Sequence, residues 1–336
     1  MAYATMKALV YEGPRVMNVR EVPVPDPLVD EVLIRVERVG ICGSELSGYL
    51  GENELRKPPL IMGHEFSGVV EKVGAGVNGI RIGDRVTVNP LMSCGNCRRC
   101  RGGTPQLCAE RKVIGVARPG AFAQYVAVPA GQVVKLPDSV TMDAGALTEP
   151  LACAIHAARL ARLDPADRLL VFGAGPIGLL IVRAAQIFGL TDIVVADLNK
   201  YRLQIAEAWG ARSVLSADEA GKLAPQGYDV TVDAVGVEAT RAASVRLARL
   251  GGRVVFSGLH DTANAMPMNI VVRNELELKG AFCYDACDFE TALSWLAAGR
   301  VDLAPWTEHH PLEDGQACFE RLLSNPGPVA KIVLTL

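Results

Sequence analysis

The sequence has little of what directs a chain to a membrane, a nucleic acid or a fibrous assembly. Its 336 residues contain no apolar run of 18 residues, no internal repeat, no low-complexity tract and no block of like charge. The net charge is −3 and the 34 basic residues are scattered, which argues against a nucleic acid or an acidic membrane surface as a partner. Aromatic residues make up only 5% of the chain, which is compatible with a polar ligand pocket.

Residues 1–10 lack the basic and then apolar profile of a signal peptide, so we expect a soluble, cytoplasmic protein. In that compartment the nine cysteines should be reduced, and close groups of cysteine then indicate metal ligands rather than disulfides. Half of the residues are apolar and the length is typical of two domains, so the chain can bury substantial cores.

A glycine-rich turn organises the second half of the chain. The apolar run 169–172 has the length of a buried parallel strand, and an apolar helix is predicted over 179–188. The motif between them allows a tight turn and a close approach of the backbone to a pyrophosphate at the helix N-terminus. It consists of Gly173, Gly175 and Gly178, with Pro176 suited to the first helical turn.

A carboxylate stands where a dinucleotide-binding unit needs one. A second apolar run, 193–196, ends in Asp197, 19 residues after Gly178, where a carboxylate can bind the hydroxyls of an adenosine ribose. The alternative interpretation is an ordinary strand–helix turn without a ligand. Because a carboxylate repels a 2′-phosphate, Asp197 favours NAD over NADP.

The pattern of predicted secondary structure changes near residue 143. Before it, short Val- and Ile-rich runs typical of an all-β domain occur at 6–11, 16–22, 32–39, 68–73, 85–88 and 123–128. After it, strands are predicted at 193–197, 213–215, 230–235, 253–257 and 277–281, and helices at 200–209, 240–250, 289–298 and 312–323. This alternation predicts a doubly wound parallel sheet. A last strand, 330–336, has no helix after it and is expected to return to the β domain.

Four cysteines lie within fifteen residues and are separated by glycines: Cys94, Cys97, Cys100 and Cys108. Zinc prefers four ligands in a tetrahedron, and a glycine-rich loop can fold around it. An iron–sulfur cluster and unliganded reduced cysteines are the alternatives. With all four positions filled by protein, such a zinc site would be closed and structural.

A second set of potential metal ligands is dispersed: Cys42, His64, Glu65 and Glu149. Taken singly, each has an ordinary interpretation as a buried thiol, a core or surface histidine, or a loop carboxylate. Should they meet in space, a thiolate, an imidazole and a carboxylate would leave zinc an open position for a substrate oxygen.

Several segments taken together are specific: GICGSE (40–45), GHEFSG (63–68), GDRV (83–86), the four cysteines, GAFAQYV (120–126), Glu-Pro (149–150), GAGPIG (173–178) and KIVL (331–334). Through them the sequence resembles the zinc-dependent medium-chain dehydrogenase/reductase family, in the branch of sorbitol and other polyol dehydrogenases. The resemblance covers essentially the full length. It implies an α/β protein, with a GroES-like β domain at 1–152 completed by 289–336, and a Rossmann NAD-binding domain at 153–288.

The resemblance also implies roles for single residues. Cys42, His64 and Glu149 match the ligands of a catalytic zinc, and Glu65 matches a carboxylate that binds zinc directly or through water, in exchange with Glu149. Ser44 matches the hydroxyl that passes the substrate proton outward. Asp197 and Arg202 match contacts to the adenosine ribose. The segments that line the nicotinamide half correspond to Ile177, Ser257, Gly258, Leu259, Ala281, Phe282 and Cys283.

Three departures from the family bear on the substrate. The chain has Ser47 where members often have histidine, Gly48 where sorbitol dehydrogenases have an aromatic residue, and Cys283 where they have a substrate-binding arginine. These differences favour a polyol, sugar or cyclitol other than sorbitol.

The expected reaction is the reversible oxidation of a secondary alcohol to a ketone with NAD, by a homodimer or homotetramer that holds two Zn²⁺ ions per chain, one catalytic and one structural. The alternatives are a threonine-type amino-alcohol dehydrogenase and a catalytically inert cofactor-binding relative.

Overall fold

The computed structural model describes residues 5–336, which divide into two compact units. The β unit comprises the described part of Met1–Glu149 together with Asp285–Pro326 and Lys331–Leu336. The α/β unit comprises Pro150–Tyr284 and Gly327–Ala330. Among residues 5–336, no helix combines the length and hydropathy needed to cross a membrane.

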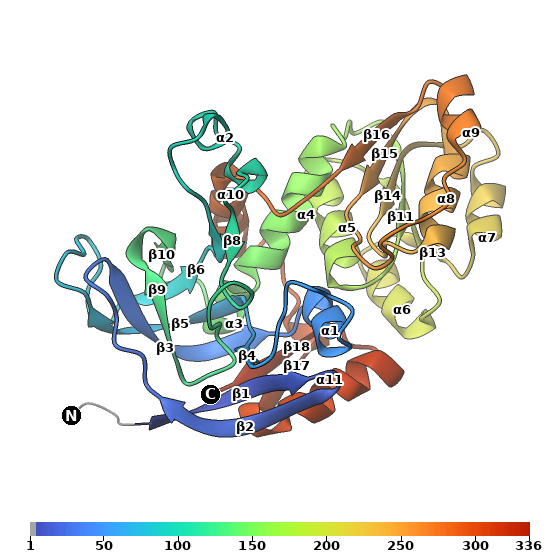
Figure 1. The fold of residues 1–336 in the computed structure, drawn as a ribbon. Coiled ribbons are helices and arrows are strands. Elements are labelled where there is room, and N and C mark those ends of the chain that lie inside the picture. The colour runs from blue at the N-terminus through green and yellow to red at the C-terminus, as the bar shows by residue number, and fades with distance from the viewer. Residues whose placement is uncertain (1–4) are drawn as a thin grey trace. The chain divides into compact units, whose positions relative to one another are not determined.

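The β unit is built on a seven-stranded sheet in which β10, β6, β5, β3, β18 and β17 are neighbours in that order, and β9 also pairs with β3 (Figure 1). The pairs are antiparallel except β17 with β18. The antiparallel pairing of β18 with β3 confirms the expected return of the last strand. The strands are β3 (Glu31–Gly40), β5 (Glu65–Val73), β6 (Arg85–Val88), β9 (Tyr125–Pro129), β10 (Val133–Lys135), β17 (Thr307–Pro311) and β18 (Lys331–Thr335).

Two small sheets and several helices complete the β unit. A three-stranded sheet has the order β2, β1, β4, and a two-stranded sheet pairs β7 with β8. Their bounds are β1 (Thr5–Gly13), β2 (Val16–Pro23), β4 (Leu60–Ile61), β7 (Leu91–Met92) and β8 (Lys112–Val113). The helices are α1 (Gly43–Tyr49), α2 (Arg98–Arg101), α3 (Met142–Ala146), α10 (Ala286–Ala297) and α11 (Gly315–Ser324). Helix α10 begins three residues earlier than predicted, because Asp285 caps it by accepting from the Asp288 amide at 2.9 Å.

The α/β unit contains the predicted doubly wound sheet. Its six strands are parallel and have the order β13, β12, β11, β14, β15, β16, which is the order 3-2-1-4-5-6 of dinucleotide-binding folds. The strands are β11 (Arg168–Phe172), β12 (Asp192–Ala196), β13 (Arg212–Val214), β14 (Tyr228–Asp233), β15 (Ala248–Phe256) and β16 (Glu277–Gly280). The helices are α4 (Thr148–Leu160), which begins two residues before the unit, α5 (Pro176–Ile187), α6 (Lys200–Ala208), α7 (Ala217–Leu223), α8 (Glu238–Leu247) and α9 (Met268–Arg273).

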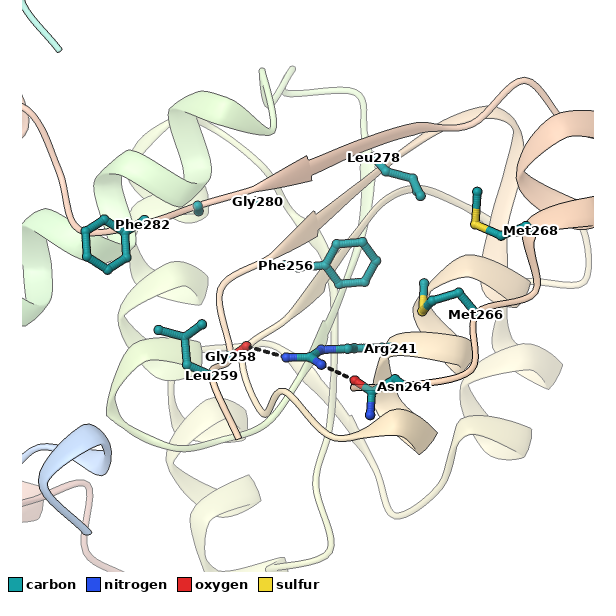
Figure 2. Close-up of a pocket in the computed structure, with 11 residues that line it drawn as sticks. Arg241, Phe256, Gly258, Leu259, Asn264, Met266, Met268, Leu278, Gly280 and Phe282 are labelled. Carbon is teal, nitrogen blue, oxygen red and sulfur yellow. Dashed lines mark hydrogen bonds between the residues drawn. The ribbon is translucent and has the colours of Figure 1, made fainter. Parts of the chain in front are cut away.

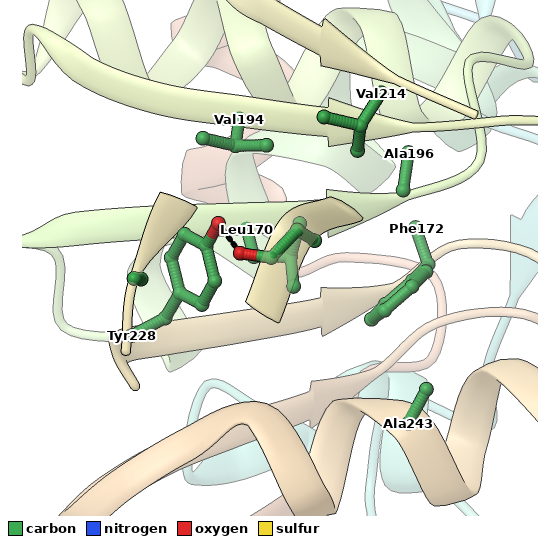
Figure 3. Packing of buried hydrophobic residues seen from close by; sticks show 9 residues of the cluster. Leu170, Phe172, Val194, Ala196, Val214, Tyr228 and Ala243 are labelled. Carbon is green, nitrogen blue, oxygen red and sulfur yellow. Dashed lines mark hydrogen bonds between the residues drawn. The ribbon is translucent and has the colours of Figure 1, made fainter. Parts of the chain in front are cut away.

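The core of this unit explains one boundary that was predicted wrongly. Leu170, Phe172 and Val194 are fully buried in it, and the hydroxyl of Tyr228 donates to the Ala220 carbonyl at 2.8 Å (Figure 3). The helix predicted over 240–250 ends at Leu247, because the buried Ala248 already pairs with Tyr228 as the start of β15. Pairing in the sheet here overrides local helix propensity.

Candidate metal centres and dinucleotide site

Strand pairing brings three of the dispersed residues together in the β unit. Cys42 follows β3 and is the N-cap of α1, His64 immediately precedes β5, and Glu65 is the first residue of β5. Gly40 pairs with Glu65 across the two strands. One ligand atom each of Cys42, His64 and Glu65 lies within 4.8 Å of the others. A thiolate, an imidazole and a carboxylate at this separation form a donor set that suits zinc.

Glu45, which the sequence analysis did not single out, orients this set. Its carboxylate accepts from the amides of Cys42 at 3.0 Å and Gly63 at 2.9 Å, and lies 2.8 Å from Nδ1 of His64. A carboxylate on one ring nitrogen leaves the other, Nε2, for a metal ion. Its position three residues after the helix N-cap is the capping-box signal that would have revealed it.

The contacts between Glu45 and His64 shift the pKa of both side chains. Burial acts to raise the pKa of Glu45, but the charge and hydrogen bond of His64 outweigh it and lower that pKa. Burial acts to lower the pKa of His64, while Glu45 and the Cys42 thiol together raise it well above its usual value. Because a proton and a metal ion bind the same imidazole nitrogen, metal binding would compete with protonation of His64.

Lys331 is a second contributor that sequence reasoning missed. Its ammonium forms an ion pair with Oε2 of Glu65, and both side chains are about 1% exposed. Burial alone would lower the pKa of Lys331, but the Glu65 carboxylate raises it. Gly40 lies between the two, and a Cβ there would be 2.6 Å from both Glu65 Oε2 and Lys331 Cε. The pair thus needs glycine at this position.

Ser44 and Glu149, the other two residues predicted for this site, lie outside the group formed by Cys42, His64 and Glu65. Ser44 is in the first turn of α1, and its hydroxyl donates to the Cys42 sulfur at 3.4 Å. Glu149, the second residue of α4, is buried but is not part of the group formed by Cys42, His64 and Glu65.

The four clustered cysteines meet as their spacing predicts. Sulfur–sulfur distances are 3.5 Å for Cys97–Cys100, 3.6 Å for Cys94–Cys108 and 3.9 Å for Cys94–Cys100. Four sulfurs placed tetrahedrally at ~2.3 Å from zinc would lie about 3.8 Å apart, so the residues fit this metal. A hydrogen bond from Ser93, with smaller contributions from neighbouring thiols, lowers the pKa of Cys100 to about 6, which favours the thiolate that a metal requires.

The glycine motif of the α/β unit connects β11 to α5 as predicted. Gly173 has a φ of +99°, and a Cβ on Gly178 would lie 1.8 Å from the Gly173 carbonyl oxygen, so the turn excludes side chains at both positions. Gly175 is the N-cap of α5, and a Cβ there would meet no atom within 4 Å. The helix N-terminus is therefore open to a phosphate.

Asp197 follows β12 and faces this turn. Its carboxylate accepts from the amides of Ala174 at 2.5 Å and Asn199 at 2.7 Å. Arg202 lies on α6, where Nε donates to the Val329 carbonyl at 3.2 Å. Burial lowers the pKa of Arg202, and the charge of Asp197 opposes that shift.

The ends of β14, β15 and β16 hold most of the residues predicted to line the nicotinamide half. A cavity of about 550 Å³ here includes Gly258, Leu259, Ala281 and Phe282 (Figure 2). Ile177, Ser257 and Cys283 do not line it. Arg241 also lines this cavity and donates to the Gly258 carbonyl at 3.1 Å and to Asn264.

Asp233, which the sequence analysis did not identify, shapes these loops. Its buried carboxylate accepts from the amides of Val235 and Gly236, each at 3.1 Å. A Cβ on Gly258 would lie 2.2 Å from the Gly236 nitrogen, so the loops after β14 and β15 touch backbone to backbone. Burial raises the pKa of Asp233.

Comparison with known proteins agrees with this arrangement. Residues 29–138 match the alcohol dehydrogenase GroES-like domain and residues 176–298 match the zinc-binding dehydrogenase domain. The chain is 35% identical to sorbitol dehydrogenase of Bacillus subtilis, over 98% of this chain and 97% of that protein. It is also 35% identical to 2-dehydro-3-deoxy-L-galactonate 5-dehydrogenase of Pseudoalteromonas atlantica, over 98% of each chain. A zinc-binding dehydrogenase of Sinorhizobium meliloti, solved with NADP, superposes with a TM-score of 0.90 at 31% identity, over 99% of this chain and 100% of that one.

The cysteine lobe makes a first prediction. Cys97→Ser should release one zinc ion per chain and lower the melting temperature, because structural zinc sites bind with apparent free energies on the order of 10–16 kcal/mol. Metal content by mass spectrometry and thermal denaturation measure both effects. Cys287→Ser, at an exposed cysteine outside the lobe, is the control and should change neither quantity. Retention of two zinc ions by Cys97→Ser, with an unchanged melting temperature, would refute the assignment.

The buried ion pair between Lys331 and Glu65 leads to a second prediction. Lys331→Met should destabilise the protein by about 3–5 kcal/mol, because Glu65 is left as a buried charge without compensation. Denaturation in the presence of a chelator measures this effect. Lys135→Met removes an ion pair to Asp84 in which the lysine is half exposed, and should cost no more than about 1 kcal/mol. Equal losses in the two variants would contradict the prediction.

Proposed function

The chain belongs to the zinc-dependent medium-chain dehydrogenase family, in its polyol dehydrogenase branch, and we propose how its residues oxidise a secondary alcohol of a polyol, sugar or cyclitol with NAD. The observation that carries the proposal is the convergence of Cys42, His64 and Glu65 in the β unit. These residues would hold the catalytic zinc, with Glu65 and Glu149 exchanging as the carboxylate ligand. The four cysteines of the lobe would hold a second, structural zinc.

When bound, zinc supplies a Lewis acid and the dinucleotide accepts the hydride. Ser44, whose hydroxyl lies beside the Cys42 sulfur, would relay the proton of the substrate hydroxyl, taking it up as its own hydroxyl proton passes outward. Ser47, in the place of the histidine found in many members, donates to the Ser44 carbonyl at 3.0 Å. Because no imidazole stands at this position, the onward path of the proton would be shorter or filled by water.

The substrate class follows from the carboxylate ligands. Simple alcohol dehydrogenases of this family use a second thiolate in the place of Glu149. A carboxylate can also accept a hydrogen bond from a substrate hydroxyl beside the reacting carbon. Relatives named for sorbitol and for a deoxygalactonate both act on molecules with several hydroxyls. We propose a vicinal diol as the reacting group.

Location and assembly complete the proposal. None of the nine cysteines, all of which lie among the described residues, forms a disulfide, which is compatible with a reducing compartment such as the cytoplasm. Among residues 5–336, strand β16 pairs with β15 on one side and with no strand on the other, so this edge can pair with a second copy in a homodimer or homotetramer.

Asp197 generates a test of cofactor choice. NAD should be preferred over NADP, and Asp197→Ala should reduce this preference about tenfold to a hundredfold, since hydrogen bonds to a charged group contribute roughly 1.5–3 kcal/mol. The measurement is kcat/KM for each dinucleotide. Asp218→Ala, an exposed carboxylate in the same unit, should leave the ratio unchanged. Equal kcat/KM for the two cofactors in the unaltered protein would refute the choice of NAD.

The reaction itself is tested by one panel of polyols, cyclitols, L-threonine and simple alcohols, assayed with NAD under the same conditions. A vicinal diol should react best, because its second hydroxyl can donate to a carboxylate ligand, and a hydrogen bond to a charged group contributes roughly 1.5–3 kcal/mol. Activity should vanish in Cys42→Ala and fall sharply in Glu149→Ala. Preference for threonine would indicate an amino-alcohol dehydrogenase, and preference for hexanol would contradict the role of Glu149. A single zinc ion per chain, without turnover, would indicate an inert relative.

A further inference from the structure

Arg56 is a buried cation beside the proposed catalytic centre. It lies in the segment between α1 and β4, and only 6% of its surface is exposed. Its Nη2 donates to the Ser44 hydroxyl at 3.2 Å. Its Nε is buried and has no acceptor among residues 5–336. The guanidinium therefore has hydrogen-bonding capacity that the described protein does not use.

The charge of Arg56 is compensated only partly, through its Coulomb interaction with Glu45. Within the described part of the chain, no carboxylate forms an ion pair with it. The charge of Arg56 contributes to the lowered pKa of the nearby Glu45. The carboxylate oxygens of Glu45 nevertheless contact other groups, namely the Cys42 amide, the Gly63 amide and Nδ1 of His64. Burying a cation is costly unless an anion compensates it. The position therefore favours a negatively charged ligand.

The location ties this cation to the substrate side of the site. The Ser44 hydroxyl that accepts from Arg56 also donates to the Cys42 sulfur. The arginine reaches this hydroxyl by passing over Gly48, where a Cβ would lie 2.3 Å from Arg56 Cδ. Gly48 stands where sorbitol dehydrogenases carry an aromatic residue, so the space freed by that loss is occupied by Arg56.

We propose that Arg56 determines specificity by binding a carboxylate of the substrate, which makes the substrate a polyhydroxy acid rather than a neutral polyol. The inference rests on the proposed function and narrows it. A guanidinium offers a planar pair of N–H donors that matches the two oxygens of a carboxylate. One buried positive charge is also balanced by the single negative charge of a carboxylate, whereas a phosphate monoester would bring nearly two.

The experiment compares aldonates with the alditols that share their hydroxyl configuration, such as D-gluconate with D-glucitol, using the zinc-loaded enzyme and NAD. The unaltered protein should show at least a tenfold higher kcat/KM for the better aldonates than for their alditols. Arg56→Met should abolish this ratio, and Arg56→Lys should retain part of it. Gly48→Ala should also reduce it, because the new methyl group displaces the arginine. Lys57→Met removes an exposed positive charge one residue away and should leave the ratio unchanged.

Two further measurements separate a binding role from a structural one. Calorimetry should detect binding of the preferred aldonate to the zinc-loaded protein without NAD, and Arg56→Met should lose it. The same variant should melt no lower than the unaltered protein, since replacing an unpaired buried charge by an apolar side chain removes a desolvation cost.

The outcomes are distinct. An unchanged aldonate-to-alditol ratio in Arg56→Met, or a preference for polyol phosphates over aldonates, would overturn the assignment of Arg56. Turnover of alditols alone would retain the proposed function and refute this inference. If no polyol or aldonate reacts, the proposed function fails, and the calorimetric comparison still decides whether Arg56 binds a carboxylate.

Discussion

The candidate catalytic centre depends on the pairing of β3 with β5 and with β18, which meet at Gly40. This residue pairs with Glu65 on one side and with Val333 on the other. Cys42 then follows Gly40 by two residues, and His64 precedes Glu65 by one. A slip of one residue in the pairing of β3 with β5 would turn Glu65 away from the site, because successive side chains in a strand point to opposite faces. The separation of the potential ligands is thus set by the register of these paired strands.

Charge balance explains why this donor set suits a divalent cation. A thiolate at Cys42 and the carboxylates of Glu45 and Glu65 are brought together with Lys331 and Arg56 as the neighbouring cations. Lys331 compensates Glu65, while Cys42 and His64 supply a thiolate and an imidazole nitrogen that a metal ion could hold. A divalent cation would neutralise part of the remaining negative charge of this set.

Local patterns made much of this molecule predictable, and long-range pairing limited the rest. The turn at Gly173 and Gly178 was predictable because the contact that requires glycine at Gly178 is made to Gly173, within one strand–helix unit. The cysteine lobe was predictable because all four thiols lie in one loop. Lys331 could not be found in this way, because its partner Glu65 is joined to it only through the sheet. The predicted end of the helix at 240–250 was wrong for the same reason, because local propensity carries no information on the pairing of Ala248 with Tyr228.

The departures from the sorbitol dehydrogenases acquire a physical meaning through Arg56. Taken separately, the replacement of an aromatic residue by Gly48 and of an arginine by Cys283 reads as a loss of two substrate contacts. The structure instead fills the space at Gly48 with a guanidinium that comes from the segment before β4. A cation held by burial and by one hydroxyl is poorly suited to stabilising the fold, since an apolar side chain would fit at lower cost. Its presence beside Ser44 is better explained by a ligand whose carboxylate contacts the guanidinium, since its Nε has no acceptor among residues 5–336.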